Sequence, residues 1–153
     1  MDVKIINPFL TAVLSTFEQM FNFTAEAKEP FLLDITMGHS WEVTGLLGLT
    51  GDAMGVVGFR INRTLAYKLL ELSGLTDIKA DEKTQMAEQL VSEFTNIVAS
   101  SAVSNIKDLN ISVTPPKTFT GRNHLIPWPK NYPVVGIPFV TKYGTYEVDV
   151  CFK

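Results

Sequence analysis

The sequence predicts a single α+β domain over residues 1–153, in which an antiparallel sheet packs against one long helix and two further helices. Two observations lead to this fold class. Segments rich in β-forming residues, each interrupted by a turn, lie at residues 43–59 and 132–152, as expected for two β-hairpins. Helical periodicity occurs elsewhere in the chain. Separate runs of strands and helices are typical of an α+β fold rather than a βαβ fold.

The first helix is expected to begin at Asn7 and Pro8 and to continue to Phe21. Asparagine is a favoured N-cap residue, and proline is favoured at the first helical position. The apolar residues that recur at helical spacing are Leu10, Val13, Leu14, Phe17, Met20 and Phe21. This pattern predicts a helix of about four turns with one apolar face.

The first hairpin is expected to consist of strands at residues 43–49 and 54–59, joined by a turn at residues 50–52. The glycines inside these strands are Gly45, Gly48, Gly55 and Gly58. Glycine weakens a strand, so its presence there indicates a bulge or a position where another part of the chain approaches the backbone closely.

Two more helices are expected in the middle of the chain. Asn62 is expected to cap a helix over residues 63–72, which Gly74 ends. Asp81 is expected to cap the longest helix of the chain, over residues 82–107.

The C-terminal third is expected to be mainly strand. A strand at residues 111–120, interrupted by two consecutive prolines, precedes an ordered loop at residues 121–133 and a second hairpin at residues 132–142 and 145–152. In the last strand Tyr146, Val148, Val150 and Phe152 alternate with Glu147, Asp149 and Cys151. Such alternation predicts a half-buried antiparallel strand.

The composition argues against several classes of function. The net charge is −3 and the pI is near 5.3, with scattered arginines, whereas nucleic-acid binders usually carry a basic patch. No run approaches the ~20 apolar residues of a membrane span, and no signal peptide is indicated. We therefore expect a cytoplasmic protein that binds neither membrane nor nucleic acid.

Cysteine and histidine usage indicates no metal site on this chain. The single cysteine, Cys151, allows no internal disulfide and is expected to be structural. His39 and His124 are expected to be surface or capping residues, because neither has a His, Cys or carboxylate at metal-ligand spacing.

The long helix carries a polar face. Placed at ~100° per residue, the residues of this face are Gln89, Glu93, Asn96 and Ser100. The residues expected in the core are Met86, Leu90, Phe94, Ile97, Val98 and Ser101. Small residues at Ser92, Ala99 and Ser100 would let another protein approach closely. Glu93 can engage a cation and Asn96 can hold a water molecule, although any solvated helix face can carry such a pair.

The chain resembles the CheX branch of the CheC/CheX/FliY group of chemotaxis proteins. The resemblance rests on segments at residues 7–10, 45–51, 93–97 and 137–139, together with Gly55. In sequence these segments are Asn-Pro-Phe-Leu, Gly-Leu-Leu-Gly-Leu-Thr-Gly, Glu-Phe-Thr-Asn-Ile and Ile-Pro-Phe. Their order and spacing together carry the resemblance, which implies a CheX/CheC-like α+β fold.

The resemblance implies a phosphatase acting on the aspartyl phosphate of a CheY-type response regulator. Asn96 would orient the attacking water, and Glu93 would pair with the active-site lysine of the regulator. The regulator would supply the aspartyl phosphate and the Mg²⁺, so no cofactor is expected on this chain. A single Glu-x-x-Asn motif favours the CheX type, which implies a homodimer. Gln89 and Ser100, where the sequence departs from the family pattern, are expected to contact the partner.

Two other hypotheses stay open. The chain could be a non-catalytic module that binds a receiver domain or another signalling protein. A small-molecule binder is a third interpretation, and it rests only on Phe119, Trp128, Tyr132 and Tyr143, which core and loop packing also explains.

Overall fold

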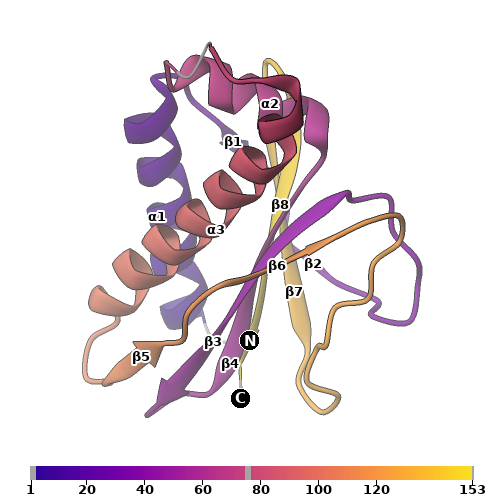
Figure 1. Cartoon of the computed structure of the whole chain (residues 1–153). Coiled ribbons are helices and arrows are strands. Elements are labelled where there is room, and N and C mark those ends of the chain that lie inside the picture. The colour runs from indigo at the N-terminus through magenta and orange to yellow at the C-terminus, as the bar shows by residue number, and fades with distance from the viewer. Residues whose placement is uncertain (1–2, 75–76, 153) are drawn as a thin grey trace.

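An antiparallel sheet forms the centre of the fold, as Figure 1 shows. The computed structural model describes residues 3–74 and 77–152. Strands follow the order β1-β7-β8-β4-β3-β5, with β2 also paired to β7 and β6 also paired to β3. The strands are β1 (Glu26–Ala27), β2 (Phe31–Leu32), β3 (Val43–Gly51), β4 (Gly55–Ile61), β5 (Ile111–Val113), β6 (Lys117–Thr120), β7 (Val134–Thr141) and β8 (Gly144–Phe152).

Helices α1 (Val3–Phe21), α2 (Arg63–Leu72) and α3 (Ala80–Ser104) lie on one face of this sheet (Figure 1). The core between the layers is rich in aromatic rings. The ring centroid of Phe94 on α3 lies 4.5 Å from that of Phe59 on β4, and Phe17 on α1 stacks on Tyr146 of β8 at 5.1 Å. Because these four side chains are buried, they fix both long helices against the sheet.

The first helix begins earlier than the sequence predicts. It starts at Val3, and Pro8 lies inside it rather than at its first position. Ile6 is buried three residues before the buried Phe9, so the apolar face extends N-terminally beyond Asn7. The free energy gained by burying this face outweighs the loss of the one main-chain hydrogen bond that a proline removes.

The predicted bounds of α2 are confirmed, but its capping side chain differs. Asn62 occupies the N-cap position without a side-chain cap, and its Oδ1 accepts a hydrogen bond from the Glu42 N–H at 3.0 Å. Oε1 of Glu42 in turn accepts from the Arg63 N–H at 3.0 Å, so Glu42 caps the helix. Gly74 follows with a φ of 87°, the left-handed conformation expected after a helix end.

Helix α3 is shifted relative to the predicted range of 82–107. It begins at Ala80 and ends at Ser104. Asp81 is therefore not the cap but lies in the first turn with Glu82, where negative charge complements the helix dipole.

Both predicted hairpins are confirmed as β3–β4 and β7–β8. The predicted interrupted strand appears as β5 and β6, which pair with different parts of β3. Strands β1 and β2 were not predicted, because two residues are too short for an alternating pattern.

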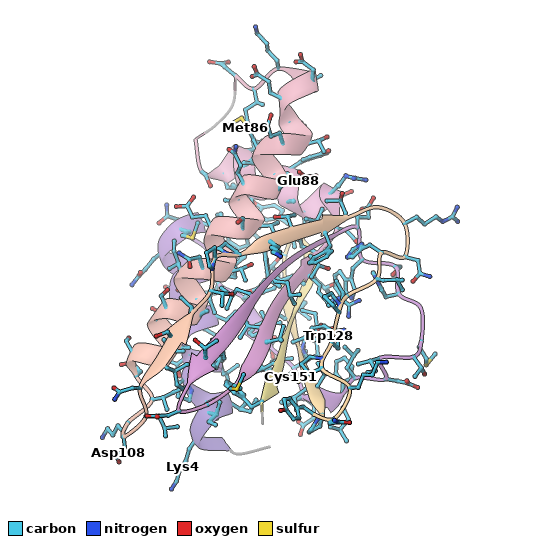
Figure 2. The ribbon with its side chains drawn as sticks, turned by 60° about the horizontal axis from the view of Figure 1, so that its bottom comes forward. Lys4, Met86, Glu88, Asp108, Trp128 and Cys151 are labelled. Atoms are coloured by element: carbon cyan, nitrogen blue, oxygen red, sulfur yellow. The ribbon has the colours of Figure 1, made fainter. Side chains whose placement is uncertain are left out.

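The prediction that β8 is half-buried is wrong. Glu147, Asp149 and Cys151 are buried, although they point away from the helices. Residues 31–42 and 121–133 cover this second face, and a Cβ placed on Gly58 would lie 3.1 Å from the Trp128 ring. Figure 2 shows Trp128 on the side of the sheet away from α3. The two carboxylates tolerate burial there because Arg60 pairs with both.

The two histidines join these covering loops. Their ring centroids lie 4.7 Å apart, and Nε2 of His39 donates to the His124 carbonyl oxygen at 2.7 Å. Nδ1 of His124 donates to the Gly121 carbonyl oxygen at 2.9 Å, and its Nε2 accepts from the Thr44 hydroxyl at 2.7 Å. Both rings bond to the main chain, as capping residues do, but both are partly buried rather than on the open surface.

Candidate active site on the long helix

Glu93 and Asn96 are exposed on the face of α3 that points away from the sheet. Three residues of helix correspond to a rotation of about 300°, so the two side chains point within about 60° of each other and lie on adjacent turns. Gln89 and Ser100 are also exposed and belong to the same face. The structure thus brings all four predicted site residues to one surface.

The core residues behind this surface fix the rotation of the helix. Val91, Phe94, Thr95 and Val98 are buried against the sheet and the neighbouring helices. The Phe94 ring, between Glu93 and Asn96 in sequence, also packs 6.3 Å from the ring of Phe17 on α1. Since its aromatic anchor cannot turn without losing these contacts, the helix holds its polar face outward.

The predicted faces of the helix are only partly correct, since Met86 and Ser101, expected in the core, are half-buried. Ile97, expected in the core, is 37% exposed and lies beside Asn96 on the outer surface. Ala99, expected to form part of a contact surface for another protein, is fully buried. The core stripe consists of Ala87, Leu90, Val91, Phe94, Thr95, Val98, Ala99 and Ala102. It is rotated from the predicted one because α3 packs against both α1 and β3, and its alanines allow close approach.

The side chains of Glu93 and Asn96 are available to another molecule. Within residues 3–74 and 77–152, neither takes part in a side-chain hydrogen bond or an ion pair. The carboxylate can pair with a cation, and the carboxamide can accept one hydrogen bond while donating another. Such a pair can position a water molecule next to a group supplied by a partner.

A pocket of about 460 Å³ lies on the opposite side of the molecule, between the two loops that cover the second sheet face. Its walls include Met37, Leu125 and Trp128, with Arg60 contributing to the lining. Of the four aromatic residues behind the small-molecule hypothesis, Trp128 alone is among the lining residues, and none of Gln89, Glu93, Asn96 and Ser100 is.

Among the described residues, no group of three or more His, Cys, Asp or Glu side chains is arranged to hold a metal ion. In the same residues, no helix combines the length and apolar character that crossing a bilayer requires.

Comparison with known families gives a match over more than half of the chain. The family model described as "Chemotaxis phosphatase CheX" matches residues 43–140, a range that includes the hairpin β3–β4 and the whole of α3. No curated protein sequence matches the chain.

Solved structures share the fold over nearly their whole length. A CheC-like superfamily protein from Shewanella sp. PV-4 is 26% identical, with a TM-score of 0.86, and the match covers 100% of this chain and 99% of that one. CheX from Desulfovibrio desulfuricans is 22% identical with a TM-score of 0.86, covering 97% and 99% of the two chains. A structure of the CheX–CheY–BeF3–Mg²⁺ complex from Borrelia burgdorferi contains a chain 23% identical, with a TM-score of 0.83 and 97% coverage of each chain. These likenesses confirm the predicted α+β, CheX/CheC-like fold.

Proposed function

Because this chain belongs to the CheX family of chemotaxis phosphatases, we propose that it hydrolyses the aspartyl phosphate of a CheY-type response regulator. In this reaction a water molecule attacks the phosphorus atom, the bond from phosphorus to the aspartate oxygen breaks, and the regulator recovers a free carboxylate. Inorganic phosphate is released. The chain contributes positioning and electrostatics, which supply most of the catalysis in phosphoryl transfer.

Asn96 is proposed to orient the attacking water. Its carboxamide oxygen accepts a hydrogen bond from the water, and its NH2 group remains free to donate to a phosphoryl oxygen. The exposure of Asn96 supports this role, because the side chain must reach into the active site of another protein.

Glu93 is proposed to pair with the active-site lysine of the regulator. A carboxylate on the adjacent helical turn can form this ion pair while Asn96 faces the phosphoryl group. Gln89 and Ser100 flank the pair on the same face and are proposed to contact the surface of the regulator.

One observation carries the proposal: Glu93 and Asn96 share one exposed surface of a helix whose other side is buried in the core. A helix seated in this way presents both groups with little freedom to rearrange. Positioning catalysis requires such preorganisation.

The remaining reaction components are proposed to come from the partner. The Borrelia burgdorferi structure is a complex of CheX with CheY, BeF3 and Mg²⁺, which supports a CheY-like partner for this chain as well. Mg²⁺ is accordingly proposed to bind the regulator, with no cofactor on this chain. By analogy with CheX-type relatives, the chain is proposed to act as a homodimer in the cytoplasm.

The proposal is tested by incubating the purified protein with phosphorylated receivers from the same cell and Mg²⁺. Phosphate release is then followed over time. Faster release from one receiver than its own spontaneous rate is the expected result. Tight binding to a phosphorylated receiver without faster release would instead favour the alternative of a non-catalytic binding module.

A further inference from the structure

Helix α3 packs tightly against strand β3 at Gly45. A Cβ placed on Gly45 would overlap Oγ1 of Thr95, and it would lie 3.0 Å from Cγ1 and 3.2 Å from the carbonyl oxygen of Val91. Ordinary van der Waals contact starts at 3.4 Å, so the helix backbone approaches this strand as closely as a glycine allows. We infer that the close contact between Gly45 and Thr95 positions Glu93 and Asn96 by holding the turn of α3 that carries them. This inference rests on the proposed function.

The contact lies behind the proposed catalytic pair. Val91 and Thr95 are each two residues from Glu93, which places them about 160° around the helix axis from it. A side chain added at Gly45 would therefore press on the helix from the side opposite to Glu93, and it would push this turn in the direction in which Glu93 points. Thr95 itself lies between Glu93 and Asn96 in sequence, so the push reaches the turn that carries both groups.

The strand cannot recede from the helix at this position. Gly45 is paired with Phe59 of β4 on one side and with Thr118 of β6 on the other. A β-strand held by neighbours on both sides moves only with the whole sheet. The Phe59 side chain also supports the helix directly through its contact with Phe94.

The helix cannot move outward as a rigid body either. Phe94 is held between Phe59 and Phe17, and Ala99 and Ala102 are fully buried one and two turns further on. Ala87 and Leu90 are buried on the N-terminal side of the contacted turn, so a helix anchored before and after this turn should bend there when β3 presses on it. Bending here changes the direction of Asn96 relative to Glu93.

The Thr95 hydroxyl that faces Gly45 is also bonded within the helix. It donates a hydrogen bond to the Val91 carbonyl oxygen at 2.7 Å, within the same helix. Hydroxyl groups that bond to the carbonyl four residues earlier are associated with helix bending. The hydroxyl, the Val91 carbonyl and the bare Cα of Gly45 therefore form one packed unit behind the pair.

Gly45→Ala tests this inference, with Gly48→Ala as the matched control on the same strand. A Cβ on Gly48 would lie 3.3 Å from the Thr114 side chain and 3.9 Å from the Gly55 carbonyl oxygen, and none of its near neighbours belongs to the helix. We expect Gly45→Ala to lower kcat for receiver dephosphorylation by about 100-fold, the loss typical of a displacement on the order of 1 Å. KM should change much less, and Gly48→Ala should keep the wild-type kcat.

The double variant Gly45→Ala/Thr95→Ala separates positioning from general packing. Removing the Thr95 hydroxyl relieves the worst overlap, so the double variant should recover most of the lost kcat. The inference is overturned if Gly45→Ala keeps wild-type kcat per folded molecule, with folding measured by circular dichroism. It is also overturned if the double variant recovers nothing.

A measurement independent of activity separates this inference from the proposed function. In NMR spectra, the side-chain amide signals of Asn96 should shift in Gly45→Ala and return towards wild type in the double variant. If wild type accelerates no receiver's phosphate loss, the proposed function fails, and these shifts alone then decide whether the contact positions Asn96. Unchanged Asn96 signals in Gly45→Ala overturn the inference in either case.

Discussion

Arg60 on β4 donates a hydrogen bond from Nη1 to Oδ2 of Asp149 on β8 over 3.2 Å, on the sheet face opposite the helices. The exposed fractions of the two side chains are 4% and 0%. Oε2 of Glu147 accepts from the same Nη1 at 3.5 Å. Burial and then the neighbouring Glu147 raise the pKa of the Asp149 carboxyl well above its usual range. The second face of the sheet thus contains a buried cluster of Arg60, Glu147 and Asp149 beneath the covering loops.

Replacing Arg60 by methionine should destabilise the fold strongly at neutral pH. Removing one partner of a buried ion pair commonly costs about 3–5 kcal/mol, because a buried charge loses its compensation. Urea unfolding monitored by circular dichroism measures the loss. Arg63→Met is the control, since Arg63 pairs with Glu42 at the surface, where an ion pair contributes roughly 0–1 kcal/mol. Equal losses in both variants would contradict a structural role for the buried cluster.

Stability should fall on acidification because of His124. Burial is the main cause that lowers the pKa of His124 from its usual value, with smaller contributions from His39 and Arg60, and the Gly121 carbonyl opposes them. The unfolded chain then binds more protons than the folded one below a pH of about 6.5. The contribution of His124 is therefore complete above that pH and declines as the pH falls below it.

The comparison of wild type with His124→Gln isolates this effect from other titrating groups. We expect the variant to be less stable at pH 8, where it loses the hydrogen bond from Thr44. The difference between the urea midpoints should shrink from pH 7 to pH 5. A difference that stays constant or grows over this range would show that His124 does not titrate as its surroundings indicate.

Asn96→Ala should abolish most phosphatase activity and leave the fold intact. Loss of one positioning contact commonly costs on the order of 100-fold in kcat. The melting temperature should hardly change, because Asn96 is exposed and alanine favours helix. Gln85→Ala, an exposed change on the same helix, is the control and should keep full activity. Near-wild-type turnover in Asn96→Ala would rule out the water-positioning role.

Glu93→Gln should weaken docking as well as turnover. A hydrogen bond to a charged group contributes roughly 1.5 kcal/mol to binding. Its loss should therefore raise KM for the phosphorylated receiver about tenfold. The dependence of KM on salt concentration should also decrease, since the removed interaction is electrostatic. Steady-state kinetics at two ionic strengths measure both effects. If KM and its salt dependence match those of wild type, Glu93 does not pair with a cation of the partner.

Local patterns predict the parts of this fold that depend on neighbours in sequence. The turn at Gly51 identifies the first hairpin, and Gly74 correctly ends α2. The start at Pro8 is wrong because burial of Ile6 and Phe9 is a tertiary effect that a capping signal does not contain. Boundaries set by packing therefore lie beyond what local signals specify.

The face of a strand or helix can be predicted, but not what covers it. Alternation in β8 correctly groups Glu147 with Asp149, yet it carries no information about the loops that bury them. The same limit applies to α3, where periodicity places Glu93 and Asn96 together and outward but assigns Ile97 to the core. Which residues of α3 face the core also depends on α1, which packs beside it. The spacing of apolar residues within α3 contains no information about that neighbour.

The position of β8 in the sheet has a consequence for synthesis of the chain. Although it is the last strand, β8 lies between β7 and β4, and Cys151 is the register partner of Val56. A ribosome therefore produces α1, β3, β4 and both remaining helices before the strand that joins the two halves of the sheet exists. Until residues 144–152 emerge, the apolar side chains that pack on β8, such as Phe17 and Phe59, lack this partner. Completion of the fold is thus a late event that depends on distant contacts, the circumstance in which chaperones most often assist a newly made protein.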